Sequence, residues 1–474
     1  MSAGGFGQNY PDVDVPPPDQ FADPPKLKVA QTPDGTDLHH SQVRIAYRLA
    51  RRCPDELMFV HGLGWHYWDG RRWVEDAKGH AVRAVLEELR IAIAESFSTG
   101  DTDFRKDVHK CETSRGVAGV LDLASSLEPF AVTTDELDKD PYLFNTHSGT
   151  LDLRTLDLKP HNPADRLTKV ASCDYDPTAT GETFTAFINE VLPDPDVRKF
   201  VQTLFGLALI GKVLEHVLPI FTGVGRNGKS TLLNVVRACM GDYAIEVEPD
   251  LLIERDRAHP TGLLDLRGAR LAVCQESDEG RKLAVGTVKR LTGGDPIRAR
   301  RMRADFVQFD PSHTSILVTN HKPRVPGDDP ALWRRLRVVP FDVVVPNPDA
   351  NLPDRLDLER DVVLAWAIQG LQAYGESGLQ APAAVQAATD TYRASSDVLG
   401  RFMEERTYRR NNDGVYVRAG DLFADWQSWC ARNGEHAGRQ NEFAEAVARL
   451  GVQKVNRSIG RVYVGLGLVT DREG

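Results

Sequence analysis

The chain has 474 residues, of which 41% are hydrophobic and 27% charged, as in globular proteins with several domains. No apolar run reaches the roughly 18 residues of a membrane span, and the first twenty residues lack the basic start and apolar stretch of a secretory signal. The formal net charge of −10 argues against nucleic-acid binding through overall charge, and six scattered cysteines without a CxxC pair argue against a disulfide framework or zinc site.

The N-terminal third shows mixed signals. Residues 1–45 are rich in Pro, Asp and Gly and have no sustained period, which predicts a flexible arm. Aromatic and polar residues alternate over 64–76, which predicts a β-hairpin, and apolar spacing of three and four residues predicts a helix over 81–97. Short strands joined by a turn are expected over 144–161.

Helices and apolar strands then alternate, around a glycine-rich segment. GVGRNGKS fits the pattern GxxxxGK[ST] at every fixed position, between an apolar strand (VLPIF) and an amphipathic helix (STLLNVVRACM). Glycines let backbone N–H groups face phosphate oxygens, so ATP and Mg²⁺ are the expected cofactors, with Lys229 on the β- and γ-phosphates and Ser230 on the metal. The expected nucleotide contacts are Gly223, Gly225, Asn227, Gly228, Lys229, Ser230 and Thr231.

Polar residues that follow the next strands are expected to complete this site. Glu276 follows the apolar strand 271–274 and is expected to act on Mg²⁺ or on the attacking water. Asn320 ends the strand SILVTN and is expected either to contact the γ-phosphate or to be a turn residue. Arg334 and Arg335 precede another strand and are either an arginine finger or a surface basic cluster.

Charge and pattern single out three further segments. Residues 281–303 hold eight Lys or Arg and one acid, so the acidic average hides a basic segment. A helix is expected in 360–378, within a helical connector over 347–395. Over 396–474, helices followed by a strand, a glycine turn and a strand predict a winged helix-turn-helix, whose partner is either DNA or protein.

In chain order, GVGRNGKSTLL, LAVCQESDEGRKL, VKRLTGGDPIRAR and ILVTNHKPRVPGDDPALWRRLRVVPF resemble the phage and plasmid replicative helicase–primase family. These are superfamily 3 helicases of the AAA+ class, related to poxviral replication ATPases. The resemblance covers roughly residues 60–474 and is most specific over 220–342. It implies an α/β fold: an AAA+ P-loop core (184–346), an N-terminal α+β helicase-associated collar (46–183) and a C-terminal winged helix (396–474).

The resemblance also implies a homo-oligomeric ring, usually a hexamer, with ATP between subunits. Lys229, Glu276 and Asn320 would then be catalytic, and Arg335, with Arg334 as its rival, would reach the neighbour's nucleotide. The segment TGGDPIRARRMR would form a hairpin that grips single-stranded DNA. The implied DNA contacts are Lys289, Arg298, Arg300, Arg301 and Arg303.

Two departures from the family pattern bear on function. Gln275-Glu276 stands where many relatives have two acids, so Glu276 is either a metal ligand or the residue that activates water. Only about 50 residues precede the collar, too few for the primase–polymerase domain of many members, so no primase activity is expected.

These features and the resemblance predict an ATP-hydrolysing DNA helicase that replicates a phage, plasmid or mobile element in the cytoplasm of a bacterial host. The resemblance implies 3′→5′ movement. The helicase would act on single-stranded and forked DNA, with a loader or a separate primase as partner and without a membrane. The alternative is an ATP-regulated, origin-binding initiator, which binds one duplex sequence tightly and hydrolyses ATP slowly. A P-loop kinase would leave the basic hairpin and the winged helix unexplained.

Overall fold

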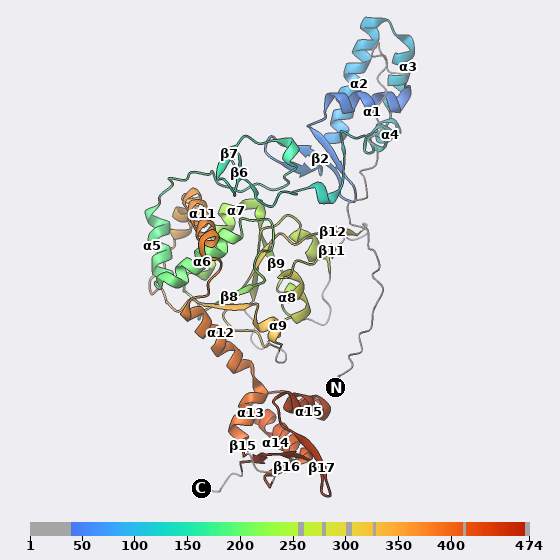
Figure 1. Ribbon diagram of the computed structural model, residues 1–474. Coiled ribbons are helices and arrows are strands. Elements are labelled where there is room, and N and C mark those ends of the chain that lie inside the picture. Colours follow the sequence, from blue (N-terminus) through green and yellow to red (C-terminus); the bar gives the residue numbers. More distant parts are fainter. Residues whose placement is uncertain are drawn as a thin grey trace, which may run out of the picture.

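The computed structural model describes residues 39–254, 260–276, 281–299, 306–325, 329–410 and 414–469. Figure 1 shows an N-terminal part, a central α/β part and a C-terminal unit in succession. In the described part of the chain, no helix is both long and apolar enough to cross a membrane. Most of the predicted arm lies outside the described residues, as do Arg300, Arg301 and Arg303.

The N-terminal part packs four helices beside a small sheet with strand order β3-β2-β1-β4. The expected hairpin over 64–76 is present as β2 and β3, and the expected helix as α2. The prediction of a flexible arm over 1–45 was wrong for its last residues. The first helix begins at Ser41, and its Ile45 is buried in this core together with Leu49. The bounds are α1 (Ser41–Arg52), β1 (Leu57–Val60), β2 (Gly64–Trp68), β3 (Trp73–Glu75), α2 (His80–Thr99), α3 (Thr102–Cys111), α4 (Ser114–Ala124) and β4 (Ala131–Val132).

The short strands expected over 144–161 form an antiparallel meander of β5 (Leu143–Asn145), β6 (Thr150–Asp152) and β7 (Asp157–Lys159). Phe144 and Leu151 of this meander share one core with the helices of the central part rather than with the N-terminal helices. Arg270 joins the meander to the central part, because its buried guanidinium donates to the carbonyls of Leu209 and Leu143. Burial lowers the pKa of Arg270, whose guanidinium lies against the rings of Phe144 and Tyr243 as well as these backbone oxygens.

The centre of the molecule is a five-stranded, all-parallel sheet with strand order β14-β8-β13-β10-β9. Near-continuous apolar strands such as LPIFT are typical of a parallel sheet that is buried on both faces. The mixed α/β class expected from the sequence is therefore present. The strands are β8 (Leu218–Thr222), β9 (Ala244–Val247), β10 (Leu271–Glu276), β13 (Thr314–Thr319) and β14 (Leu336–Pro340). Helices α5 (Glu182–Val191) and α6 (Pro195–Leu207) precede the first strand, and α7 (Lys229–Met240), α8 (Val285–Leu291) and α9 (Pro330–Trp333) lie between strands.

The segment 347–395, expected to be a connector, contributes to the central core. It forms α10 (Leu352–Asp357), α11 (Arg360–Ser377) and α12 (Ala383–Ser396). Buried side chains such as Leu364 pack with α6 and α7. Helix α12 lies along the edge strand β14, where the Val338 N–H donates to Thr389 Oγ1 at 3.0 Å. An edge strand covered in this way is protected from pairing with other chains.

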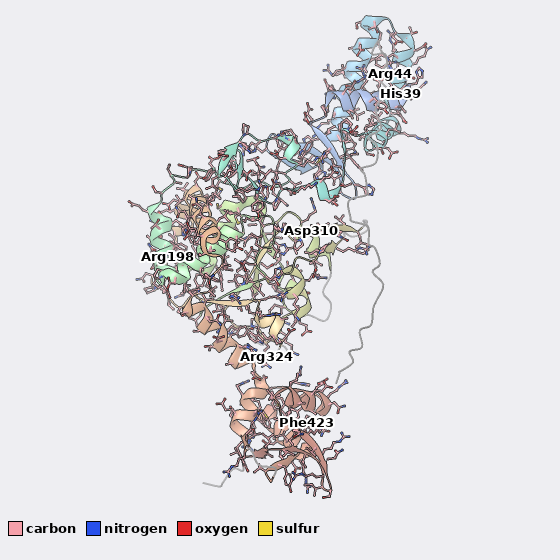
Figure 2. The ribbon with its side chains drawn as sticks, viewed as in Figure 1. His39, Arg44, Arg198, Asp310, Arg324 and Phe423 are labelled. Atoms are coloured by element: carbon pink, nitrogen blue, oxygen red, sulfur yellow. The ribbon has the colours of Figure 1, made fainter. Side chains whose placement is uncertain are left out.

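The C-terminal unit (residues 397–469) has its own aromatic core, in which Phe402, Trp426, Trp429 and Phe443 contact one another. Glu435 links the unit to the central part by accepting from Arg324 Nη1 at 3.0 Å, and it accepts from Arg401 Nη2 of its own unit at 3.0 Å. Figure 2 labels Arg324 where the central part meets this unit. The elements are α13 (Val398–Arg406), β15 (Thr407–Arg409), β16 (Tyr416–Arg418), α14 (Ala419–Arg432), α15 (Gln440–Arg449), β17 (Lys454–Arg457), β18 (Gly460–Val464) and β19 (Leu466–Leu468).

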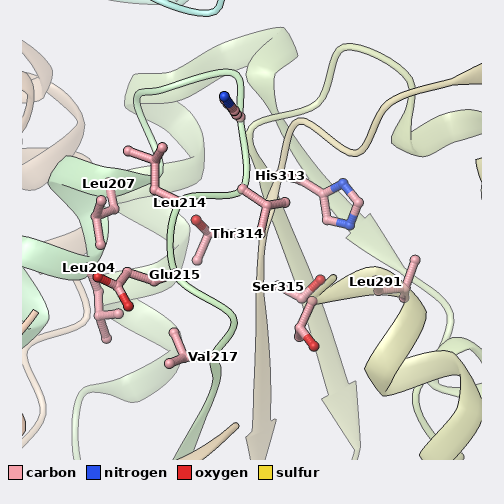
Figure 3. Close-up of a pocket in the computed structure, with 12 residues that line it drawn as sticks. Leu204, Leu207, Leu214, Glu215, Val217, Leu291, His313, Thr314 and Ser315 are labelled. Carbon is pink, nitrogen blue, oxygen red and sulfur yellow. The ribbon is translucent and has the colours of Figure 1, made fainter. Parts of the chain in front are cut away.

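A buried histidine lies at the amino end of β13, beside a cavity of about 10 Å³. Figure 3 shows the His313 ring on the Leu291 side of the strand and Glu215 on the other side. Among the described residues neither ring nitrogen of His313 has a hydrogen-bond partner, and burial lowers its pKa to about 4. The cavity holds about one water and is a packing defect rather than a ligand site.

Gly370→Ala is expected to destabilise the central part. Helices α6 and α11 cross so closely that a Cβ at Gly370 would lie 2.1 Å from the Gln202 carbonyl oxygen. Overpacking against backbone costs about 1–3 kcal/mol, a fall of several degrees in the thermal midpoint. Gly375→Ala, on the same helix with open space around it, is the matched control and should be neutral or stabilising. Equal midpoints for both variants would contradict the close crossing.

His313→Leu is expected to reduce the acid sensitivity of folding. Because the folded-state pKa of about 4 lies below the ordinary histidine pKa of 6.5, the unfolded chain binds the extra proton. The stability contributed by neutral His313 is therefore complete above pH 6.5 and is lost as the pH falls towards 4. Between pH 7 and pH 5 the wild type should lose about 2 kcal/mol more than the variant in urea unfolding. The control His216→Leu, at an exposed position, should retain the wild-type loss.

Candidate functional site

The glycine-rich segment forms a tight loop between the end of β8 at Thr222 and the start of α7 at Lys229. Gly225 and Gly228 have φ angles of 97° and 79°, in the left-handed region that glycine adopts at least cost. A Cβ at Gly228 would also lie 2.3 Å from Val191 Cγ1 of α5. The two glycines are thus required by the backbone path, which turns the loop around the amino end of α7.

The chain that follows β14 holds this loop in place. The Phe341 N–H donates to the Thr222 carbonyl at 2.8 Å, and the Val345 N–H donates to the Arg226 carbonyl at 2.8 Å. Asn227 is buried, and its Nδ2 donates to the Phe341 carbonyl at 3.1 Å. The Asn227 amide therefore positions the loop. Sequence reasoning missed Phe341 and Val345, because no local pattern marks a backbone contact made across more than a hundred residues.

Lys229 lies at the base of the loop with its ammonium turned inward. Its Nζ donates to the Gly223 carbonyl at 2.8 Å and to Asn320 Oδ1 at 3.2 Å. Burial lowers the pKa of Lys229, because few polar groups replace the water around its charge. Two residues singled out separately in the sequence are thus in direct contact.

Strand register explains why these groups meet. Thr222 of β8 lies opposite Thr319 of β13, and Thr319 lies opposite Glu276 of β10. Because parallel strands end at one edge of the sheet, Asn320 stands between the glycine loop and the backbone of Glu276. The three segments that the sequence marked for nucleotide chemistry are brought together there.

A pocket of about 390 Å³ opens at this edge, in the size range of small-molecule sites. Ser230 is exposed at its margin, in the first turn of α7. Gln275, not expected at the site, also lines the pocket, and its Nε2 donates to Glu246 Oε1 at 3.2 Å. The lining residues are Gly225, Arg226, Asn227, Gly228, Lys229, Ser230, Thr231, Gln275, Val318 and Asn320.

Arg334 and Arg335 lie at the opposite edge of the sheet. The Leu218 N–H, at the start of β8, donates to the Arg335 carbonyl at 2.7 Å, so the length of β8, about 16 Å, separates Arg335 from the loop. Arg335 is half-buried, and its Nη1 donates to the Ala331 carbonyl at 2.7 Å, whereas Arg334 is exposed. The structure therefore brings neither arginine to the pocket of its own chain.

The basic segment contains an antiparallel pair of β11 (Ile297–Ala299) and β12 (Val307–Phe309). Arg298 is exposed, and its guanidinium lies 4.4 Å from the centre of the Phe306 ring. Lys289, in α8, is paired with Asp329, which caps α9. Arg298 is thus on the expected hairpin and Lys289 is on the helix before it. The other three predicted DNA contacts lie beyond the described residues.

Comparison with known proteins gives two family matches. Residues 46–193 match a family described as D5 N terminal like, and residues 221–335 match a family of unknown function, DUF5906. The apo structure of the C-terminal region of NrS-1 has a TM-score of 0.46 and 11% identity, and covers 90% of this chain and 100% of that one.

Viral relatives complete the comparison. A protein of Acanthamoeba polyphaga mimivirus named a "putative helicase" is 23% identical over 467 residues, covering 88% of this chain and 48% of that protein. One of African swine fever virus named a "putative primase" is 21% identical over 328 residues, covering 63% and 34%. The chain thus spans about half or less of the length of these relatives. Together the family matches and the viral relatives support a relationship to the phage-type, D5-like helicase–primase family.

Proposed function

We propose that the chain is an ATP-dependent DNA helicase of superfamily 3 that acts in the replication of a phage, plasmid or mobile element. The observation that carries the proposal is the pocket at the carboxyl edge of the central sheet. There a glycine loop at the start of a helix, the Lys229 ammonium and Asn320 converge from strands β8 and β13. Such a loop presents backbone N–H groups to phosphate, and the helix dipole adds attraction for negative charge.

The residues present fit a nucleotide with Mg²⁺. Among the described residues no three His, Cys, Asp or Glu gather as a metal site, but Mg²⁺ needs few protein ligands when phosphates supply the rest. The Ser230 hydroxyl and the Glu276 carboxylate would hold it. Bound there, Mg²⁺ neutralises charge on the phosphate oxygens. Lys229 would bind the β- and γ-phosphates, and Asn320 would orient the attacking water.

The strand order supports an AAA+ P-loop core, because β13 lies between the loop-bearing β8 and the acidic end of β10. The position of the arginines supports a ring. Arg334 and Arg335 are a strand's length from the pocket of their own chain, so they would complete the pocket of a neighbouring copy. Exposed Arg334 would make that contact, with Arg335 fixed behind it by Ala331.

DNA movement is assigned to the hairpin of β11 and β12. Its exposed Arg298, together with Arg300, Arg301 and Arg303, would contact the phosphates of a single strand in the ring's channel. Such contacts carry no sequence information. A hexameric ring, 3′→5′ movement and a winged-helix C-terminal unit complete the proposal.

Lys229→Ala is expected to abolish strand separation on a forked DNA with ATP and Mg²⁺. Without the Lys229 ammonium, the negative charge on the phosphates loses its proposed counter-charge, so ATP hydrolysis should fall by about 100-fold or more. Lys199→Ala, at an exposed position of α6, removes the same charge and should unwind like the wild type. A wild type that hydrolyses ATP but separates no fork of either polarity would contradict the helicase and favour the initiator.

Mixing two inactive variants is expected to restore activity. Chains with Lys229→Ala lack a working loop, and chains with Arg334→Ala and Arg335→Ala lack the arginines, whose loss should cost roughly 1,000-fold in hydrolysis. In mixed rings an intact loop faces intact arginines, so ATP hydrolysis should exceed the sum of the two separate samples. Activity that stays at that sum would contradict arginine supply by a neighbour.

A further inference from the structure

The C-terminal unit carries an exposed two-stranded ribbon of β17 and β18. The strands pair antiparallel from Lys454 opposite Tyr463 to Arg457 opposite Gly460. Every residue from Gln453 to Arg461 is exposed, and Figure 1 shows the pair extending away from the helices of the unit. Four residues of β17 span about 13 Å, so the ribbon is long enough to enter a groove.

The ribbon is strongly basic in an acidic chain. Residues 450–461 contain Lys454, Arg457 and Arg461 and no acid, whereas the whole chain has a net charge of −10. Local charge of this kind attracts an anionic partner whatever the sign of the average. The adjacent helix α15 differs, because its one cation, Arg449, is accompanied by Glu442 and Glu445. The anionic partner therefore fits the ribbon rather than this helix.

The cations occupy both faces of the ribbon. Side chains alternate along a strand, and directly paired residues share a face. Lys454 is opposite Tyr463, so it shares a face with Arg461, which lies two residues before Tyr463. Arg457 lies on the other face, with its guanidinium 4.8 Å from the centre of the Tyr416 ring. Arg418 of β16, opposite Val462, adds a second exposed cation to that face.

We propose that the β17–β18 ribbon binds duplex DNA by entering a groove whose two phosphate walls face its two basic faces. The major groove, about 12 Å wide, admits a two-stranded ribbon. A single strand would instead need cations and stacking aromatic rings gathered along one surface. The inference rests on the proposed function for DNA as the nucleic acid. It adds a duplex contact outside the pocket and outside the β11–β12 hairpin.

The test uses the full chain and fluorescence anisotropy with a labelled duplex and a labelled single strand of equal length, over a range of salt concentrations. Changing Lys454, Arg457 and Arg461 together to Ala should weaken duplex binding by at least about tenfold. The slope of log affinity against log salt should fall by about 3, since each phosphate contact contributes about 0.9. Single-strand binding should change much less.

The matched control removes three exposed positive charges from helices α2, α3 and α4, by Arg90→Ala, Lys106→Ala and Arg115→Ala. It has the same net charge as the ribbon variant and should bind duplex like the wild type. Thermal midpoints within about 2 °C of the wild type would show that both variants fold. A ribbon variant that binds duplex as tightly as this control would overturn the proposal, and equal losses on duplex and single strand would overturn the groove assignment.

ATP hydrolysis separates this inference from the proposed helicase. Lys229→Ala should lose hydrolysis and retain ribbon-dependent duplex binding. A wild type that binds duplex through the ribbon and hydrolyses no ATP would support the ribbon and overturn the helicase.

Discussion

The register of the parallel strands is the constraint on which the candidate site depends. Thr222, Thr319 and Glu276 lie side by side, so three loops from distant parts of the sequence begin at the same level. A slip of one residue in β13 would reverse the faces of its side chains and move Asn320 away from Lys229. The apolar side chains of these strands pack closely on both faces of the sheet, so a slip would replace fitted contacts with cavities and overlaps.

Local patterns predicted the parts of the site that are made locally. The loop between β8 and α7 follows from fixed glycine spacing, and the β2–β3 hairpin follows from alternation around a turn. Helices α3 and α4 were not predicted, because one is mainly polar and the other contains two glycines, which weaken the helical signal. The side chain of Asp101, which caps α3, was the available clue.

Contacts between distant segments could not be predicted in the same way. The loop is held by Phe341 and Val345, which sequence reasoning assigned only to a strand and its continuation. Segment 347–395 was expected to be a helical connector, yet Gly206 and Gly370 let α11 approach α6 closely enough to be buried. The relative exposure of Arg334 and Arg335 depends on the turn of α9, because adjacent residues on a helix point in different directions.

Strand β14 has an arrangement with a mechanical consequence. The proposed arginines precede its first residue, and Phe341, which holds the glycine loop, follows its last. The strand between these two ends is covered by α12 and hydrogen-bonded to β8 along its length, so its ends move together. In the proposed ring, a displacement of the arginines by the neighbour's nucleotide would be transmitted along β14 to the glycine loop of their own chain. In such a ring, the nucleotide in one pocket would affect the loop of the next pocket.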